Sequence, residues 1–144
     1  MFEKIFLDAN ILVDFVDDTR KEYAFAKTII IGYLSRQAEL FTSCDIITTV
    51  YYLSAKKEKK KALEQIGNIN RFCTIIEFSN KEVANACALM SQNSSFCDLE
   101  DTLQYVLAKK AGCEVIISND KDFFSPDLKL LNSKEFCEKY GATL

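Results

Sequence analysis

The sequence of 144 residues contains no histidine, no tryptophan, one proline and four glycines. The absence of histidine excludes Ser-His-Asp and Cys-His catalysis, zinc sites built on imidazole, and imidazole acid–base chemistry near neutral pH. Any general base must therefore be a carboxylate, a lysine, a tyrosine, a cysteine or a metal-bound water.

Long apolar runs are also missing. No stretch approaches the roughly 20 residues that a membrane helix requires, and the N-terminus lacks the apolar core of a secretory signal. None of the six cysteines forms a C-x-x-C pair, which argues against a tetrathiolate zinc site. We expect a cytoplasmic protein with free thiols and no membrane partner.

What is present suits one globular domain over residues 1–144. Hydrophobic residues make up 49% of the chain, and eleven phenylalanines and six tyrosines are available for a core. The net charge of −3 argues against coating nucleic acid by bulk electrostatics.

Short β-like runs alternate with longer helical stretches, and no linker or repeat interrupts them. Asn10 is the predicted N-cap of the first helix, and Gly112 ends the helix before the fourth strand. The predicted strands are 5–7, 38–42, 73–78, 115–117 and 128–131. The predicted helices are 11–16, 21–35, one from Ser43 or Asp45 to 56, a basic one ending near 69, 79–90, 98–111 and 133–140. This alternation indicates an α/β fold with a parallel sheet covered on both faces.

Acidic residues follow two of the predicted strands. Asp8 ends the first strand and Asp120 ends the fourth, so the two carboxylates meet at one sheet edge if those strands are neighbours. Asp98 and Asp101 share one face of a helix, and Glu100 is expected to point off that face. Each acid alone also has an ordinary structural interpretation, as a helix cap or a turn residue.

Carboxylates gathered in one place repel one another unless a cation neutralises them. Mg²⁺ prefers oxygen ligands and keeps several waters, so two or three carboxylates suffice to bind it. Such an ion activates water and stabilises charge on a phosphoryl oxygen without histidine. The acidic residues therefore predict phosphodiester chemistry.

Three segments resemble the motifs of PIN domains in order and spacing. The run from Leu7 to Asp14 resembles their opening motif, and Asp98 to Tyr105 resembles their D-x-E-D-x-x-Q helix. Val115 to Phe123 resembles their strand-end motif. The resemblance spans about residues 3 to 140 and implies a three-layer α/β/α domain with strand order 3-2-1-4-5.

The resemblance also implies a function. PIN domains are typically Mg²⁺- or Mn²⁺-dependent ribonucleases, and many small ones are toxins of VapBC-type toxin–antitoxin pairs that form homodimers. RNA is then the substrate and an antitoxin protein the partner. By position, Asp8, Asp101 and Asp120 match the metal-binding and catalytic acids, and Asp98 and Asp122 match acidic positions that vary more. The polar neighbours of the site are Asn10, Ser118 and Asn119.

One position departs from the family pattern. Where an acid usually follows the second strand, this chain has Thr49, whose hydroxyl is a weak metal ligand. Asp45 lies one turn earlier on the same helix face, where it is either a supplementary ligand or a plain N-cap.

A basic run precedes the middle of the chain. It comprises Lys56, Lys57, Lys59, Lys60 and Lys61. These lysines either contact RNA phosphates or form an ordinary solvated face. Tyr51, Tyr52 and Tyr105 either stack on bases or belong to the core or to a dimer interface.

The sequence thus leads to a metal-dependent endoribonuclease, with a catalytically weakened RNA- or protein-binding module as the alternative that Thr49 favours. An aspartate-based phosphatase or a receiver domain fits less well. The first needs D-x-D where this chain has Asp8-Ala9-Asn10, and the second needs an aspartate after the third strand, where Glu77 to Asn80 stands.

Overall fold

The computed structural model describes residues 1–144 and contains one five-stranded sheet in which every neighbouring pair is parallel. The strand order is β3-β2-β1-β4-β5, as predicted. The strands are β1 (Lys4–Leu7), β2 (Glu39–Ser43), β3 (Cys73–Ile76), β4 (Val115–Ile117) and β5 (Lys129–Leu131).

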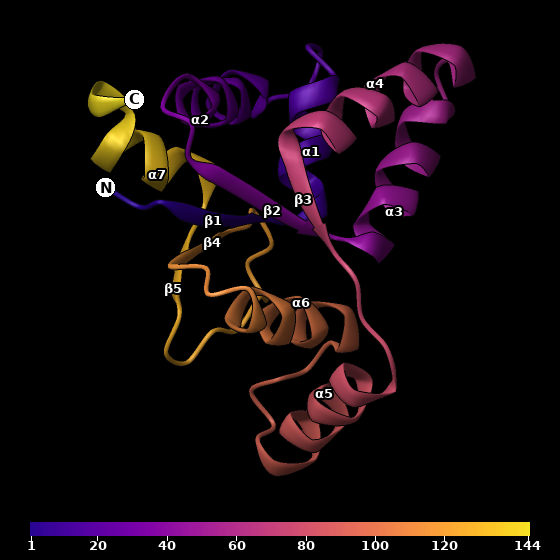
Figure 1. The fold of residues 1–144 in the computed structure, drawn as a ribbon, viewed down its shortest axis with the longest axis vertical. Coiled ribbons are helices and arrows are strands. Elements are labelled where there is room, and N and C mark those ends of the chain that lie inside the picture. Colours follow the sequence, from indigo (N-terminus) through magenta and orange to yellow (C-terminus); the bar gives the residue numbers. More distant parts are fainter.

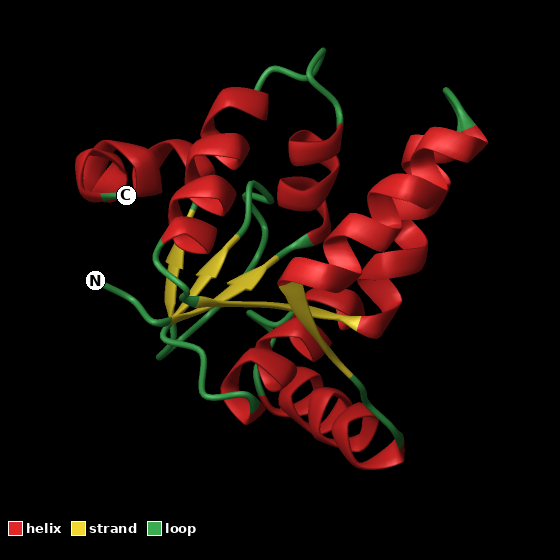
Figure 2. Ribbon diagram, turned by 45° about the horizontal axis from the view of Figure 1, so that its top comes forward, coloured by secondary structure: helices red, strands yellow, loops and turns green.

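Helices cover both faces of this sheet. Figures 1 and 2 show α5 and α6 on one face and α1, α2 and α7 on the other, with α3 and α4 side by side next to α1. The helices are α1 (Ala9–Val16), α2 (Tyr23–Ser35), α3 (Cys44–Ala55), α4 (Lys59–Phe72), α5 (Asn80–Gln92), α6 (Leu99–Lys110) and α7 (Ser133–Tyr140), followed by a short 3-10 turn at Gly141–Thr143. The three-layer α/β/α architecture is therefore confirmed.

The core lies around the two central strands. All residues of β4, and Ile5, Phe6 and Leu7 of β1, are fully buried. Continuous apolar runs of this kind are typical of strands covered on both faces, which explains why these two were recognisable in the sequence.

Several element ends differ from the sequence prediction. The N-cap of α1 is Asp8, not Asn10, because the Asp8 carboxylate accepts from the Ala9 amide at 2.6 Å and Asn10 is already helical. The basic helix runs on to Phe72 and leads directly into β3. β3 ends at Ile76, two residues short of its predicted end.

Gly112 behaves as predicted after α6. Its φ is +73°, a left-handed conformation that favours glycine. This turn leads the chain back to β4.

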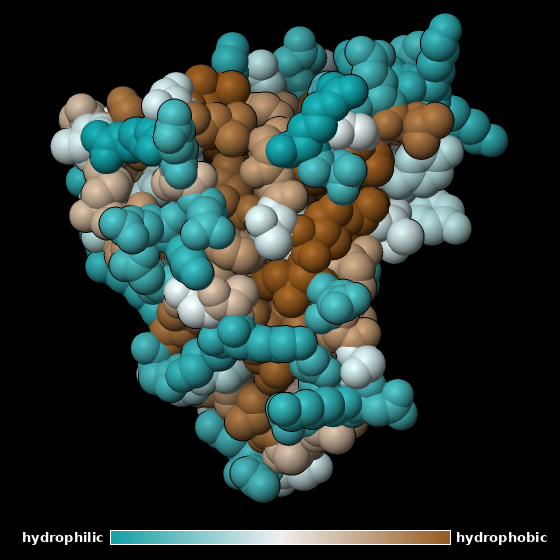
Figure 3. Space-filling model, viewed as in Figure 1, coloured by the Kyte–Doolittle hydropathy of each residue, from teal (hydrophilic) through white to brown (hydrophobic).

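The surface is not uniformly polar. In Figure 3, apolar side chains run through the centre of the face from its upper part toward its lower end, with hydrophilic side chains beside them. Large exposed apolar side chains include Tyr52 and Leu53 on α3 and Leu63 on α4. No helix is long and apolar enough to cross a membrane.

Candidate active site

The carboxyl ends of β1 and β4 lie side by side. The two strands pair in parallel with Leu7 opposite Ile117, and the Asp8 amide donates to the Ile117 carbonyl at 3.1 Å. Asp8 and Ser118 therefore face each other at the sheet edge where ligands bind in open α/β folds.

The Asp8 carboxylate is buried and fixed in position. Besides the Ala9 amide, it accepts from the Ser118 hydroxyl at 2.6 Å and from the Asn10 amide group at 3.1 Å. The buried Gln104 side chain of α6 lies close by but makes no hydrogen bond of normal geometry. Burial raises the pKa of Asp8, and the donors around it oppose that rise.

Four more carboxylates share a cavity of about 300 Å³ with Asp8. They are Asp98, Glu100 and Asp101 at the start of α6, and Asp120 after β4. The whole lining is Asp8, Ala9, Asn10, Val13, Arg20, Leu53, Asp98, Glu100, Asp101 and Asp120.

The electrostatics of this cavity concentrate on Asp101. Burial, followed by the negative charges of Asp8, Asp120 and Asp98, raises the pKa of Asp101 to about 8. A group that resists ionisation in this way lies where additional negative charge is costly. The cavity thus favours a cation.

The expectation that Glu100 points away is wrong. Glu100 lines the cavity, and burial together with the charges of Asp45 and Asp8 raises its pKa. The physical reason is that Asp98 is the extended N-cap of α6, accepting from the Asp101 amide at 2.9 Å. The cavity wraps around this helix end, so residues on different helix faces reach it.

Asn119 connects three elements behind the site. Its backbone amide donates to the Asn10 side chain at 3.1 Å, and its own amide group donates to Asp14 at 3.2 Å. Its side-chain oxygen accepts from the Ser133 amide and hydroxyl at 2.9 and 3.0 Å. Asn119 therefore ties the end of β4 to α1 and α7, and so holds Asp120 in place.

Arg20, Asp14 and Leu53 are parts of this region that sequence reasoning missed. Arg20 lies between α1 and α2, and its Nε donates to the buried Asp14 carboxylate at 2.6 Å. The sequence contains little indication of this pair. Arg20 is one of only three arginines, and it follows Asp14, the last residue of the opening motif, by six positions.

Several predicted residues do not line the cavity. Thr49 donates weakly to the Asp45 carbonyl at 3.5 Å, although Leu53, one turn along the same helix, reaches the cavity. Asp45 is not the N-cap of α3, which is Ser43, but accepts from the Ser43 hydroxyl. Asp122 is exposed, and its amide donates to Asp120 at 2.9 Å.

The lysine run lies beside the site. Lys56, Lys57 and Lys61 line a neighbouring cavity of about 520 Å³, whereas Lys59 and Lys60 are exposed at the start of α4. Of the tyrosines, Tyr105 is buried, and Tyr52 is 71% exposed.

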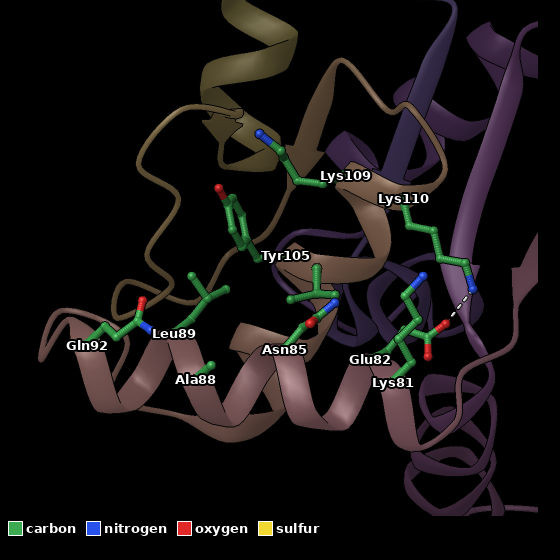
Figure 4. A pocket seen from close by; sticks show the side chains of 10 residues that line it. Lys81, Glu82, Asn85, Ala88, Leu89, Gln92, Tyr105, Lys109 and Lys110 are labelled. Atoms are coloured by element: carbon green, nitrogen blue, oxygen red, sulfur yellow. Dashed lines mark hydrogen bonds and ion pairs between the residues drawn. The ribbon is translucent and has the colours of Figure 1, made fainter.

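A larger cavity lies elsewhere, between α5 and α6, with a volume of about 680 Å³ (Figure 4). Two of its lysines are neutralised: Lys110 pairs with Glu82 and Lys109 with Asp127, both at 2.5 Å. Of the residues singled out in the sequence it contains only Tyr105, and it contains none of the predicted metal-binding acids. Volume alone therefore does not identify the site, whereas converging carboxylates do.

The donor set around Asp8 fits a hard cation that keeps part of its water shell. No three or more carboxylate or thiol side chains are placed so that they could hold a metal ion between them. Asp8, Asp101 and Asp120 thus share a cavity without forming a closed three-carboxylate site. Mg²⁺ and similar ions use one or two carboxylates and several waters, which such a cavity accommodates.

The protein is thus a parallel α/β/α domain with an acidic cavity at the carboxyl ends of β1 and β4. The chain belongs to the PIN domain family, whose sequence pattern matches residues 5–127. It is 48% identical over 139 residues to Ribonuclease VapC1 of Aquifex aeolicus (strain VF5), covering 96% of each chain.

Two solved structures share the fold at low sequence identity. VapC20 of Mycobacterium tuberculosis, a sarcin–ricin loop cleaving toxin, has a TM-score of 0.67 at 14% identity, covering 83% of this chain and 92% of that one. VapBC2 of Rickettsia felis, bound to a DNA fragment from its promoter, has a TM-score of 0.67 at 20% identity, covering 90% of this chain and 98% of that one.

Proposed function

We propose that this protein is a Mg²⁺- or Mn²⁺-dependent endoribonuclease that hydrolyses RNA phosphodiester bonds. The observation that carries the proposal is the convergence of Asp8, Asp101 and Asp120 on one cavity, with the pKa of Asp101 raised by burial and by its acidic neighbours. The 48% identity to a relative named as a ribonuclease supports it.

The roles of the residues follow from their surroundings. Asp8, Asp101 and Asp120 would hold the cation, while Ser118, Asn10 and Asn119 keep Asp8 and the end of β4 in one orientation. When bound there, a hard divalent cation would activate water and offset negative charge on the phosphate. Water adds across a P–O bond, the leaving oxygen takes a proton, and a cavity carboxylate accepts the proton from the attacking water.

We further propose that the protein is the toxin of a toxin–antitoxin pair in the cytoplasm, with an antitoxin protein as partner. The support is the VapC name of the 48% identical relative and the VapB partner in the Rickettsia structure. A homodimer is also proposed. The exposed apolar side chains Tyr52 and Leu63, 71% and 66% exposed, are typical of surfaces that proteins cover.

The alternative is a weakened PIN domain that binds RNA or protein without cleaving. Thr49 favours it, because the family usually places an acid there, and so does the lack of a ready three-carboxylate group. The phosphatase and receiver alternatives are excluded by membership of the PIN domain family.

Cleavage of single-stranded and structured RNA with Mg²⁺, with Mn²⁺ and with a chelator separates the two functions. Asp101→Asn should abolish cleavage. Asp127→Asn is the matched control. Asp127 precedes β5 and so lies near the amino ends of the strands, whereas the acidic cavity lies at their carboxyl ends. Metal-dependent cleavage that survives D127N and disappears in D101N supports the nuclease. Equal inactivity of all three proteins would favour the binding module.

A further inference from the structure

Arg20 is the one basic side chain among five carboxylates in the acidic cavity. It also lines the neighbouring cavity, as do Val13 and Leu53, so the two cavities adjoin at these residues. Five carboxylates repel a phosphate, and a positive charge where the two cavities adjoin reduces that repulsion. Arg20 supplies this charge.

The Arg20 guanidinium is anchored through one nitrogen only. Its Nε donates to Asp14 Oδ1 at 2.6 Å, and none of its four terminal N–H groups makes a hydrogen bond within the protein. The Asp14 side chain is 5% exposed, whereas that of Arg20 is 44% exposed. A buried carboxylate thus orients a cation whose planar donor pair remains free, which suits bidentate contact with phosphate oxygens.

This anchor is connected to the acidic site by side-chain hydrogen bonds. Asp14 Oδ2 accepts from Asn119 at 3.2 Å, the Asn119 amide donates to Asn10, and Asn10 donates to Asp8. The position of the guanidinium is therefore fixed relative to the Asp8 carboxylate. A merely solvent-exposed arginine would not need this connection.

We propose that Arg20 binds the two non-bridging oxygens of a phosphate in the RNA backbone where the strand passes from the neighbouring cavity into the acidic one. This inference rests on the proposed ribonuclease function. Arg20 is a substrate-binding residue, and Asp14 and Asn119 are positioning residues for it. Within the lysine run, Lys57 is less well suited, since it already pairs with Asp17 at 2.7 Å and donates to Thr19.

The test measures RNA binding without cleavage. In an Asp101→Asn background, binding of a short fluorescein-labelled oligouridine is followed by anisotropy at several salt concentrations, with and without Mg²⁺. Arg20→Met should weaken binding about tenfold, because hydrogen bonds to charged groups are strong. The slope of log affinity against log salt should fall by about 0.7, the value for one phosphate contact on a single strand.

Arg71→Met is the matched control. Arg71 lies at the end of α4, just before β3, and so near the amino ends of the strands. Its substitution should leave the RNA affinity and the salt dependence of that affinity unchanged. Arg20→Lys should restore the salt slope but only part of the affinity, because lysine cannot make the bidentate contact. In the cleaving protein, Arg20→Met should raise KM more than it lowers kcat.

A structural role for Arg20 is tested separately. Removing it leaves Asp14 buried without its cation, which lowers Tm, and Asp14→Asn combined with Arg20→Met should recover Tm but not RNA affinity. Recovery of both would overturn the proposal, as would an R20M protein that binds like R71M while the wild type cleaves RNA. If the wild type neither binds nor cleaves RNA, the proposed function fails and this inference with it.

Discussion

Asp8 shows how single side chains prepare the site. Its carboxylate is 4% exposed and is held by donors from its own helix and from the end of β4. Burial alone would favour the protonated acid, and the surrounding donors favour the carboxylate. Asp8 is thus kept in one orientation toward the cavity.

Thr49 is the residue at which the chain departs from its family. Since Leu53 lines the cavity one turn further along α3, Thr49→Glu should bring a carboxylate to the same side and raise Mg²⁺ affinity several-fold. Calorimetric titration of the purified variant measures this. Thr48→Glu, on an exposed neighbouring position, is the control. Equal affinities of wild type and T49E would remove Thr49 from the site.

The sequence predicted which residues line the cavity where they directly follow a strand. It did not predict those that only tertiary contacts bring to the cavity. Asp8 and Asp120 follow strands, so topology alone brought them to one edge. Arg20 and Glu100 were missed because a loop conformation and the shape of a helix end place them, and no periodic pattern encodes either.

Among the secondary-structure elements, the glycine that follows α6 allows a specific prediction about stability. Gly112→Ala should lower the free energy of unfolding by about 1 kcal/mol, because φ is +73° and no atom lies within 4 Å of the added Cβ. Backbone strain is then the whole effect.

Gly67 in α4 is the matched control, since its added Cβ also meets open space but the backbone is helical. Gly67→Ala should raise stability by about 0.5–1 kcal/mol. Urea unfolding of both variants measures these two changes in the free energy of unfolding, which should have opposite signs. A neutral or stabilising G112A would mean that residue 112 is not left-handed in solution.

Element existence was predictable and element ends were less so. The helix–strand alternation gave all five strands because apolar runs and glycine or polar breaks separate them. The cap of α1 was misassigned because Asp8 and Asn10 are both good caps, and only the bond to the Ala9 amide distinguishes them.

At the scale of the whole molecule, the acidic cavity predicts an unusual pH dependence. The pKa of Asp101 is raised from 3.8 to about 8 in the folded protein, so the folded state binds more protons than the unfolded state between these values. Stability without divalent metal should therefore fall as the pH rises from about 4 to 8.

The size of this effect is reduced by solvent, since Asp101 is only partly buried. After discounting for screening, we expect a loss of about 1–2 kcal/mol, or roughly 3–8 °C in Tm for a domain of this size. Thermal unfolding in chelator across this pH range measures it. Asp101→Asn should remove most of the slope, and D127N should keep it. A slope unchanged by D101N would assign the effect to other groups.

If the proposed function is right, the five-carboxylate cavity at the carboxyl ends of β1 and β4 binds a divalent cation for RNA hydrolysis. Calorimetric titration of wild type, D101N and D127N with Mn²⁺ measures this binding. We expect saturable binding to wild type and D127N, and binding at least tenfold weaker to D101N, since loss of one carboxylate ligand costs a strong charged contact. Equal binding by all three proteins, or no binding to the wild type at millimolar Mn²⁺, would contradict it.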